Sequence, residues 1–259
     1  MKTPPYSLVF YCLIFGLGCQ SVPQQSDLPY RKTQLLFEDD GTQDWQANWM
    51  LDGQRSQVIN SEQGMELIAG PEAQNDTCHT VLWTQQTFEG DICIEYDYTR
   101  TDTATRYVNI LYFHATGEGS EDYPSDIALW NDKRVVPHMK TYFHNMRTYH
   151  ISYATSTAER DYIRLRRYNP ELKRLKGTDI AEDHFETGLF RKDVIYHVQV
   201  CKYEGQIEMH IQNKSTPSDS LVCSWDVSAF PTYEEGRIGL RHMYTRSARY
   251  QDFKVWRVE

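Results

Sequence analysis

The stretch "TYHISYATSTAERDYIRLRRYNP", residues 148–170, predicts the fold most directly. On either side of its polar centre, apolar and polar residues alternate with a period of two. This pattern is typical of two antiparallel strands joined by a turn. Ile151, Ile163 and Leu165 are expected to face a core. The opposite face of the pair would carry His150, Tyr162, Arg164, Arg166 and Tyr168.

Period-two patterns recur along the rest of the chain. "DICIEYDYT" (91–99) would point Glu95 and Asp97 away from a core, and "RYVNILYFHA" (106–115) predicts a strand buried on both faces. "VIYHVQVCKYEGQIEMHIQ" (194–212) predicts a hairpin. A short helix fits within 120–132, whereas 135–146 is expected to be a loop. Short strands separated by turns predict an all-β fold with two antiparallel sheets, a sandwich or jelly roll.

Composition limits the possible partners. The chain has 259 residues, of which 40% are hydrophobic, and a formal net charge of −9. An acidic chain lacks the basic excess that nucleic-acid-binding proteins usually show, so we expect no nucleic-acid partner. After residue 32 the sequence shows no linker and no repeat. We therefore expect one domain, at 33–259, and a monomer.

The N-terminus predicts export. Lys2 precedes the short apolar stretch "SLVFYCLIFGLG" (7–18), which is too short to span a bilayer well. The following "GLGC" resembles a bacterial lipoprotein signal, with residues 1–18 removed and Cys19 lipidated. Residues 19–32 are polar and would form a flexible tether. The protein would then be anchored to the membrane through this lipid only, at the periplasmic or outer-membrane surface of the cell envelope.

Four further cysteines allow two disulfides in an exported chain: Cys78, Cys93, Cys201 and Cys223. Proximity in sequence favours Cys78–Cys93 and Cys201–Cys223. Free buried thiols are the alternative, and the spacings do not resemble a zinc site.

Four segments together resemble a known family. They are "VLWTQQTFEGDICIEYDYTRTD" (81–102), "NMRTYHISYATST" (145–157), "DYIRLRRYNP" (161–170) and "EGRIGLRHMYTRSARYQDFKVW" (235–256). The chain resembles a bacterial family of exported proteins of unknown function, often found near polysaccharide-degradation genes. The resemblance implies a concanavalin-A-like (laminin-G/glucanase) jelly roll with one concave sheet. This architecture hosts hydrolases, lyases and non-catalytic lectins, so the fold does not decide the function.

Glycoside hydrolysis and β-elimination of a uronate each need particular residues at the site of cleavage. Jelly-roll glucanases carry Glu-x-Asp-x-x-Glu on one strand, but here Glu95 and Asp97 are followed by Arg100. A solvated pair of acids is the alternative interpretation of Glu95 and Asp97. A uronate lyase needs cationic or amide groups for the sugar carboxylate, a base for the C5 proton and an acid for the leaving oxygen.

The lyase hypothesis accounts for more of the residues. His150 or His144 would be the base, and Tyr162 the acid. The substrate-binding candidates are Arg164, Arg166, Arg147, Asn145, His114 and Tyr168. Arginine suits a carboxylate because its planar guanidinium can donate two parallel hydrogen bonds. The alternative is a solvated sheet face on which Arg164 and Arg166 pair with acids such as Glu159 or Asp161.

A cofactor is not required by these hypotheses. Jelly rolls of this type often hold a structural Ca²⁺, for which Glu38, Asp39 and Asp252 are the candidate ligands. We therefore expect a carbohydrate-active exported protein that acts on an acidic polysaccharide or oligosaccharide, with a polysaccharide lyase favoured. A glycoside hydrolase, a non-catalytic glycan-binding lipoprotein and a structural envelope protein remain alternatives.

Overall fold

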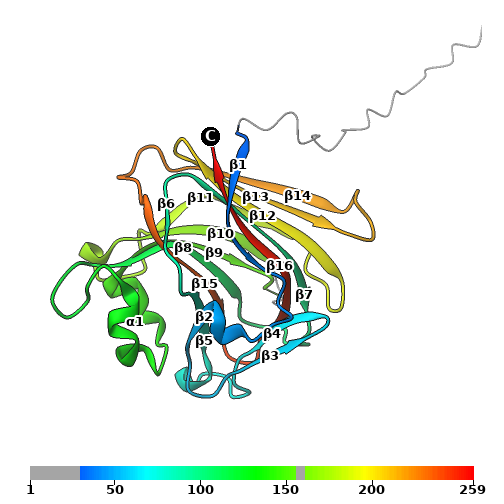
Figure 1. The fold of residues 1–259 in the computed structure, drawn as a ribbon, viewed down its shortest axis with the longest axis horizontal. Coiled ribbons are helices and arrows are strands. Elements are labelled where there is room, and N and C mark those ends of the chain that lie inside the picture. Colours follow the sequence, from blue (N-terminus) through cyan, green and yellow to red (C-terminus); the bar gives the residue numbers. More distant parts are fainter. Residues whose placement is uncertain (1–29, 156–160) are drawn as a thin grey trace, which may run out of the picture.

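The computed structural model describes residues 30–155 and 161–259, which form two antiparallel sheets packed face to face (Figure 1). The predicted two-sheet sandwich is confirmed. Strands carry alternating side chains, so each sheet can turn one apolar face towards the other sheet.

Sheet A has eight strands. Its order is β14 (Ser220–Asp226), β13 (Gln206–Asn213), β12 (Ile195–Tyr203), β7 (Ile92–Arg100), β16 (Ser247–Val258), β4 (Gly64–Ile68) and β3 (Gln57–Ser61), and β1 (Lys32–Asp39) also pairs with β16. The two ends of the described chain therefore lie side by side in this sheet (Figure 1).

Sheet B also has eight strands. Its order is β11 (Asp179–Phe185), β10 (Tyr162–Tyr168), β9 (Met146–Tyr153), β8 (Asn109–Gly117), β15 (Glu235–His242), β5 (Thr80–Thr84) and β2 (Trp49–Asp52), and β6 (Phe88–Glu89) also pairs with β15.

Short helices lie in the connections. They are the 3₁₀ helices η2 (Trp45–Ala47), η3 (Asp76–Cys78), η4 (Ile127–Arg134) and η5 (Pro170–Leu172), and the α-helix α1 (Met139–Asn145). The expected helix within 120–132 corresponds to η4. The expectation of a loop at 135–146 is wrong, because α1 forms there. Seven residues are too few to give a clear helical period, and this helix is held by the packing of its buried Tyr142.

The main core lies between the sheets. Ile94 and Tyr96 of β7 meet Ile151 of β9 and Ile163 and Leu165 of β10 in one buried cluster. Burying one such side chain contributes roughly 1.5–3 kcal/mol. The predicted inward faces of these strands and the 194–212 hairpin are confirmed.

A second apolar cluster lies on the other face of sheet B. It joins Tyr112 and Tyr168 of the sheet to Trp130 of η4 and Tyr142 of α1. The β8–β9 connection therefore covers part of the outer face of sheet B. This explains why β8 is buried on both faces, as predicted.

The expected disulfide pairing is wrong. Cys93 is bonded to Cys201, and Cys78 and Cys223 are free and buried. The cause is strand register: Cys93 and Cys201 stand opposite each other in the β7–β12 pair, with their Cα atoms 4.0 Å apart. Proximity in sequence therefore gave the wrong partner.

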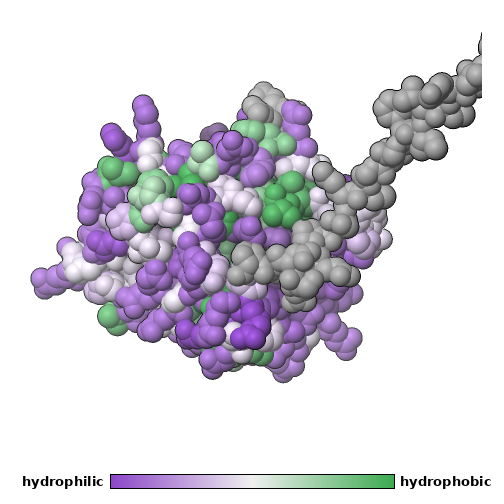
Figure 2. Space-filling model, turned by 90° about the horizontal axis from the view of Figure 1, so that it is seen from above, coloured by the Kyte–Doolittle hydropathy of each residue, from purple (hydrophilic) through white to green (hydrophobic). Residues whose placement is uncertain are grey.

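The surface is mostly polar on the face that Figure 2 shows, with small, separate hydrophobic patches. The large apolar side chains that are exposed belong to different elements, such as Leu35 of β1, Ile59 of β3 and Val222 of β14. Within 30–155 and 161–259, no helix combines the length and apolar character needed to cross a membrane.

Candidate functional site: a pocket at the strand ends of sheet B

The structure confirms the predicted polar face of the 148–168 hairpin. His150 stands between Tyr112 of β8 and Arg166 of β10 in the ladder, and Ser152 stands opposite Arg164. These side chains share the outer face of sheet B, since their neighbours Ile151 and Leu165 point into the core.

His150 is enclosed by the protein. Its side chain is 2% exposed, its Nδ1 lies 2.5 Å from the Tyr168 hydroxyl, and its Nε2 lies 2.7 Å from Ser152 Oγ. Burial, followed by the charges of Arg166 and Arg241, holds the pKa of His150 well below its ordinary value. The imidazole is therefore neutral, and a proton taken up there would lack a stabilising carboxylate partner.

The two arginines of β10 are ion-paired. Arg164 Nε donates to Asp183 Oδ2 at 2.8 Å, and Arg166 Nη2 lies 2.8 Å from Asp179 Oδ1. Both acids belong to β11, the next strand. The expected acids were Glu159 and Asp161: Glu159 lies outside the described residues, and Asp161 accepts from the backbone of Thr187 and Gly188. The positive charge that suggested an acidic ligand is thus neutralised within the sheet.

The other predicted residues are dispersed. Tyr162 lies under the Arg164 guanidinium, 4.8 Å from ring centroid to Cζ, and Tyr168 is buried beneath α1. His114 is fully buried, and neither of its ring nitrogens has a hydrogen-bond partner within the described chain. Burial, with a further contribution from the charge of Lys202, lowers the pKa of His114 to about 3.

His144 and Asn145 lie at the end of α1. They line an open pocket of about 660 Å³ whose wall also includes Asp76 and His138. The structure therefore does not bring His144 and His150 into one catalytic group, although both had been candidates for the same base.

A buried acid fixes the β8–β9 connection over sheet B. Asp52, at the end of β2, accepts hydrogen bonds from Trp83 Nε1 at 2.8 Å, Arg134 Nε at 2.6 Å and Tyr142 hydroxyl at 2.9 Å. Asp52 and Arg134 have no exposed surface. Because η4 and α1 are held in this way, part of the outer face is closed, and an open hollow lies at one end of the strands β8, β9 and β15.

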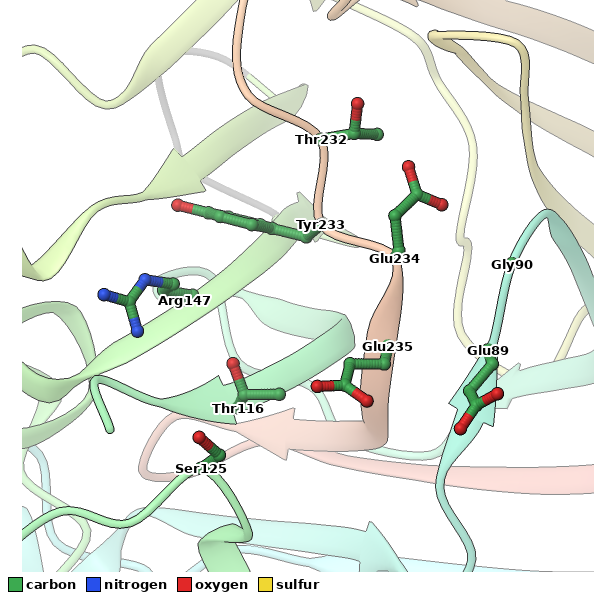
Figure 3. Close-up of a pocket in the computed structure, with 9 residues that line it drawn as sticks. All are labelled: Glu89, Gly90, Thr116, Ser125, Arg147, Thr232, Tyr233, Glu234 and Glu235. Carbon is green, nitrogen blue, oxygen red and sulfur yellow. The ribbon is translucent and has the colours of Figure 1, made fainter. Parts of the chain in front are cut away.

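That hollow, here called the Arg147 pocket, has a volume of about 610 Å³ (Figure 3). Side chains of opposite charge and several hydroxyl groups converge on it. Its lining residues are Glu89, Gly90, Thr116, Ser125, Arg147, Thr232, Tyr233, Glu234 and Glu235. Arg147 is the one predicted site residue among them.

Strand irregularities shape the pocket. A register shift after Phe113 places Thr116 of β8 opposite Arg147 of β9. Gly236, at φ +141°, lets β15 cross close to β8, because a Cβ there would lie 2.4 Å from the Ala115 nitrogen. These features bring Glu235, Thr116 and Arg147 together where the neighbouring strands β15, β8 and β9 begin or end.

Arg147 is held in a fixed orientation. Its Nη1 donates to the Glu118 carbonyl at 2.6 Å and to the Gly117 carbonyl at 3.3 Å. The side chain is half-buried and lies below the ring of Tyr233, with its guanidinium on the side away from the glutamates (Figure 3). A guanidinium has five donors, so these two contacts leave donors for a ligand.

The acidic side faces Arg147 across the pocket (Figure 3). Glu89 and Glu235 stand directly opposite each other in the β6–β15 pair, and both are exposed. Glu234 lies 3.2 Å from Lys202 Nζ, which also binds Asp91 at 2.5 Å. Sequence reasoning missed these acids because the two-residue β6 is too short to show a period.

Tyr233 forms part of the pocket wall. Its hydroxyl donates to the Tyr168 carbonyl at 2.6 Å, and its ring lies 4.0 Å from Arg167 Cζ. Burial raises the pKa of Tyr233 to about 12, so its hydroxyl stays protonated near neutral pH. The pocket thus combines carboxylate acceptors with guanidinium and hydroxyl donors, a set that can hydrogen-bond a ligand rich in hydroxyl groups.

The hydrolase candidates lie on the other sheet. Glu95 pairs with Lys32 and accepts from Trp256 Nε1 at 2.6 Å, and Asp97 pairs with His197 and Lys214. Burial raises the pKa of both carboxyls, but their hydrogen-bonding and charged partners together lower it by more. The net shift of the pKa is therefore downward for both. Neither is a protonated acid near neutral pH, which a glycosidase would need.

Two of the three candidate calcium ligands, Glu38 and Asp39, have protein partners. Asp39 accepts from Trp49 Nε1 at 2.6 Å and Asn48 Nδ2 at 3.1 Å, and Glu38 pairs with Lys254 at 3.3 Å. Asp252 lies at a positive φ of 50° in β16. No group of three or more His, Cys, Asp or Glu side chains suited to a metal occurs in 30–155 and 161–259. Cys19, and most of the 19–32 tether, lie outside the described residues.

One known protein family matches most of the chain. The family model of a domain of unknown function, DUF1961, matches residues 35–255. The chain belongs to this family. No curated protein matches it.

Solved structures share its fold. A Bacillus subtilis protein of unknown function with a galectin-like fold is 18% identical, covers 88% of this chain and 98% of its own length, and has a TM-score of 0.63. Lectin II from Ulex europaeus is 8% identical, with 88% and 100% covered and a TM-score of 0.52. A legume lectin-like domain from Entamoeba histolytica is 7% identical, with 83% and 92% covered and a TM-score of 0.53. At these identities the likeness concerns the lectin-like sandwich fold.

Proposed function

We propose that this member of the DUF1961 family binds a glycan in the Arg147 pocket without cleaving it. The observation that carries the proposal is the convergence of Arg147, three glutamates and four hydroxyl side chains on one open hollow of about 610 Å³. Volumes of this order suit small ligands, and alternating donors and acceptors suit a polyol. The lectin-like fold of the chain is compatible with this role.

The charge of the pocket favours a neutral glycan over an acidic one. Glu89, Glu234 and Glu235 outnumber Arg147, so a uronate or sulfate would meet net repulsion. The cationic side chains of β10 do not alter this balance, because Arg164 and Arg166 are neutralised by Asp183 and Asp179.

Binding explains the geometry better than β-elimination does. The expected base, His150, is buried with both ring nitrogens hydrogen-bonded, and arginine charges oppose its protonation. A general base must reach the proton that it removes and must tolerate the charge that it gains. These requirements are not met at His150.

The test is a panel of neutral and acidic oligosaccharides, measured by calorimetry with the full chain and two variants. Arg147→Ala should weaken binding of the best neutral ligand about 10-fold or more, because a hydrogen bond to a charged group contributes about 1.5–3 kcal/mol. Arg164→Ala removes a comparable cation elsewhere on sheet B and should leave affinity within about twofold.

The same samples are assayed for new reducing ends and for the ultraviolet absorbance of an unsaturated uronate. We expect neither to increase with time. Turnover that His150→Ala abolishes would overturn the proposal in favour of a lyase, and equal losses in Arg147→Ala and Arg164→Ala would remove the pocket assignment.

A further inference from the structure

We propose that His197 and His210 form a binding site for a divalent transition-metal ion, of the class Zn²⁺, Cu²⁺ or Ni²⁺, on the outer face of sheet A. This site is separate from the glycan site, which lies at the strand ends of sheet B. The inference therefore does not rest on the proposed function.

Strand register places the two histidines together. In the β12–β13 pair, His197 stands opposite Gln212, and Gln199 stands opposite His210. The histidines are therefore diagonal neighbours on one face, at a separation of about 7–8 Å that long side chains can bridge. Both line the same small groove of about 160 Å³.

Each imidazole is oriented by a carboxylate. His197 Nδ1 lies 2.9 Å from Asp97 Oδ1, and His210 Nε2 lies 3.0 Å from Glu208 Oε2. An ionised carboxylate accepts from the ring N–H, which leaves the lone pair on the other nitrogen: Nε2 of His197 and Nδ1 of His210. This carboxylate–histidine arrangement is the one that typically fixes the tautomer of metal-binding histidines.

The carboxylates are themselves held in place. Asp97 has a side chain that is 8% exposed and is bound by Lys214 as well as by His197. The histidine side chains are more accessible, at 44% for His197 and 25% for His210, so an ion could reach them. The buried acid thus supports a ligand that remains open to solvent.

The chemistry of the donors selects the class of ion. Imidazole nitrogen suits Zn²⁺, Cu²⁺ and Ni²⁺, with Zn–N distances of about 2.0–2.1 Å, whereas Ca²⁺ and Mg²⁺ prefer oxygen. Two imidazoles do not complete a coordination shell. The amide oxygen of Gln199, which lines the same groove, and water are the further ligands that we assign.

The test is calorimetric titration of the chelator-treated full chain with Zn²⁺ and with Ni²⁺. We expect one ion per chain, and at least 10-fold weaker binding in His197→Ala and in His210→Ala. Glu208→Ala keeps both histidine ligands and removes the acceptor for His210, so it should weaken binding about 10-fold. Ca²⁺ should not compete.

His144→Ala is the matched control, since His144 is a half-buried histidine in a different pocket. It should leave the affinity within about twofold. Absence of binding by the wild type, unchanged affinity in the His197/His210 double variant, or an equal loss in His144→Ala would each overturn the proposal. Circular dichroism spectra of all variants should match the wild type, because the substituted side chains lie on the outer face of the sheet.

Discussion

At the scale of single residues, Asp52 shows how one buried acid organises a connection far away in sequence. It binds Arg134 and Tyr142, 82 and 90 residues further along the chain. Nothing around Asp52 in the sequence distinguishes it from a surface acid at a strand end. Its role depends on the β8–β9 connection folding over sheet B, which a local pattern does not encode.

We predict that Asp52→Ala lowers the free energy of unfolding by about 3–5 kcal/mol, because Arg134 would be left as a buried, uncompensated charge. Denaturant unfolding of the variant measures this. The control is Asp122→Ala, which removes the partner of Lys133 from an exposed pair and should cost less than about 1 kcal/mol. Equal effects in the two variants would contradict the role of Asp52 as an anchor.

His114 should make stability depend on pH. Its pKa is about 3 in the folded chain, against an ordinary value of 6.5, because burial opposes the charged form. Between these values the unfolded chain binds the extra proton. The free energy of unfolding should therefore fall as pH decreases from about 6.5 towards 3, and be fully retained above 6.5.

Unfolding curves at a series of pH values test this. His114→Asn, which tolerates the positive φ of this position, should reduce the acid slope by up to about 1.4 kcal/mol per pH unit. An unaltered slope in His114→Asn would show that His114 is not the titrating group.

At the scale of elements, the β7–β12 pair carries both the disulfide and part of the core. The bond joins residues 108 positions apart, so it restricts the unfolded chain strongly. Replacing Cys93 and Cys201 together by alanine should lower the free energy of unfolding by about 2–5 kcal/mol. A reductant should lower the free energy of unfolding of the wild type and of Cys78→Ala, which changes a free cysteine, by similar amounts. It should leave the free energy of unfolding of the double variant unchanged.

The β9–β10 hairpin shows which properties of an element the sequence can predict. Alternation correctly assigned Ile151, Ile163 and Leu165 to the core and placed the polar side chains on the other face. It could not show that β11 would supply Asp179 and Asp183 as partners for the arginines. Which strand lies beside another is decided by long-range pairing, so the charge balance of the face was not predictable.

At the scale of the whole molecule, the class of fold could be predicted because short period-two segments separated by turns recur along the chain. The site could be predicted only in part. Arg147 was among the sequence candidates because it lies three residues before His150, in a conspicuous segment that forms β9. Glu89, Glu234 and Glu235 were not, because a two-residue strand, a loop and a register shift bring them together.

Attachment to the cell envelope remains a proposal that rests on the sequence. We propose that Cys19 is lipidated and that residues 19–32 tether the sandwich to a membrane. Fractionation of cells should find the full chain with membranes and Cys19→Ala in the soluble exported fraction. Equal distribution of the two forms would contradict the anchor without affecting the glycan proposal.

The central claim is that a glycan occupies the Arg147 pocket. Its most direct test is hydrogen–deuterium exchange of the full chain with and without the tightest neutral ligand of the oligosaccharide panel. We predict slower exchange in the segments that contribute Thr116, Arg147 and Glu234 to the pocket. A panel without any neutral ligand, or protection confined to β10 and β11 beside Arg164 and Asp183, would contradict the account.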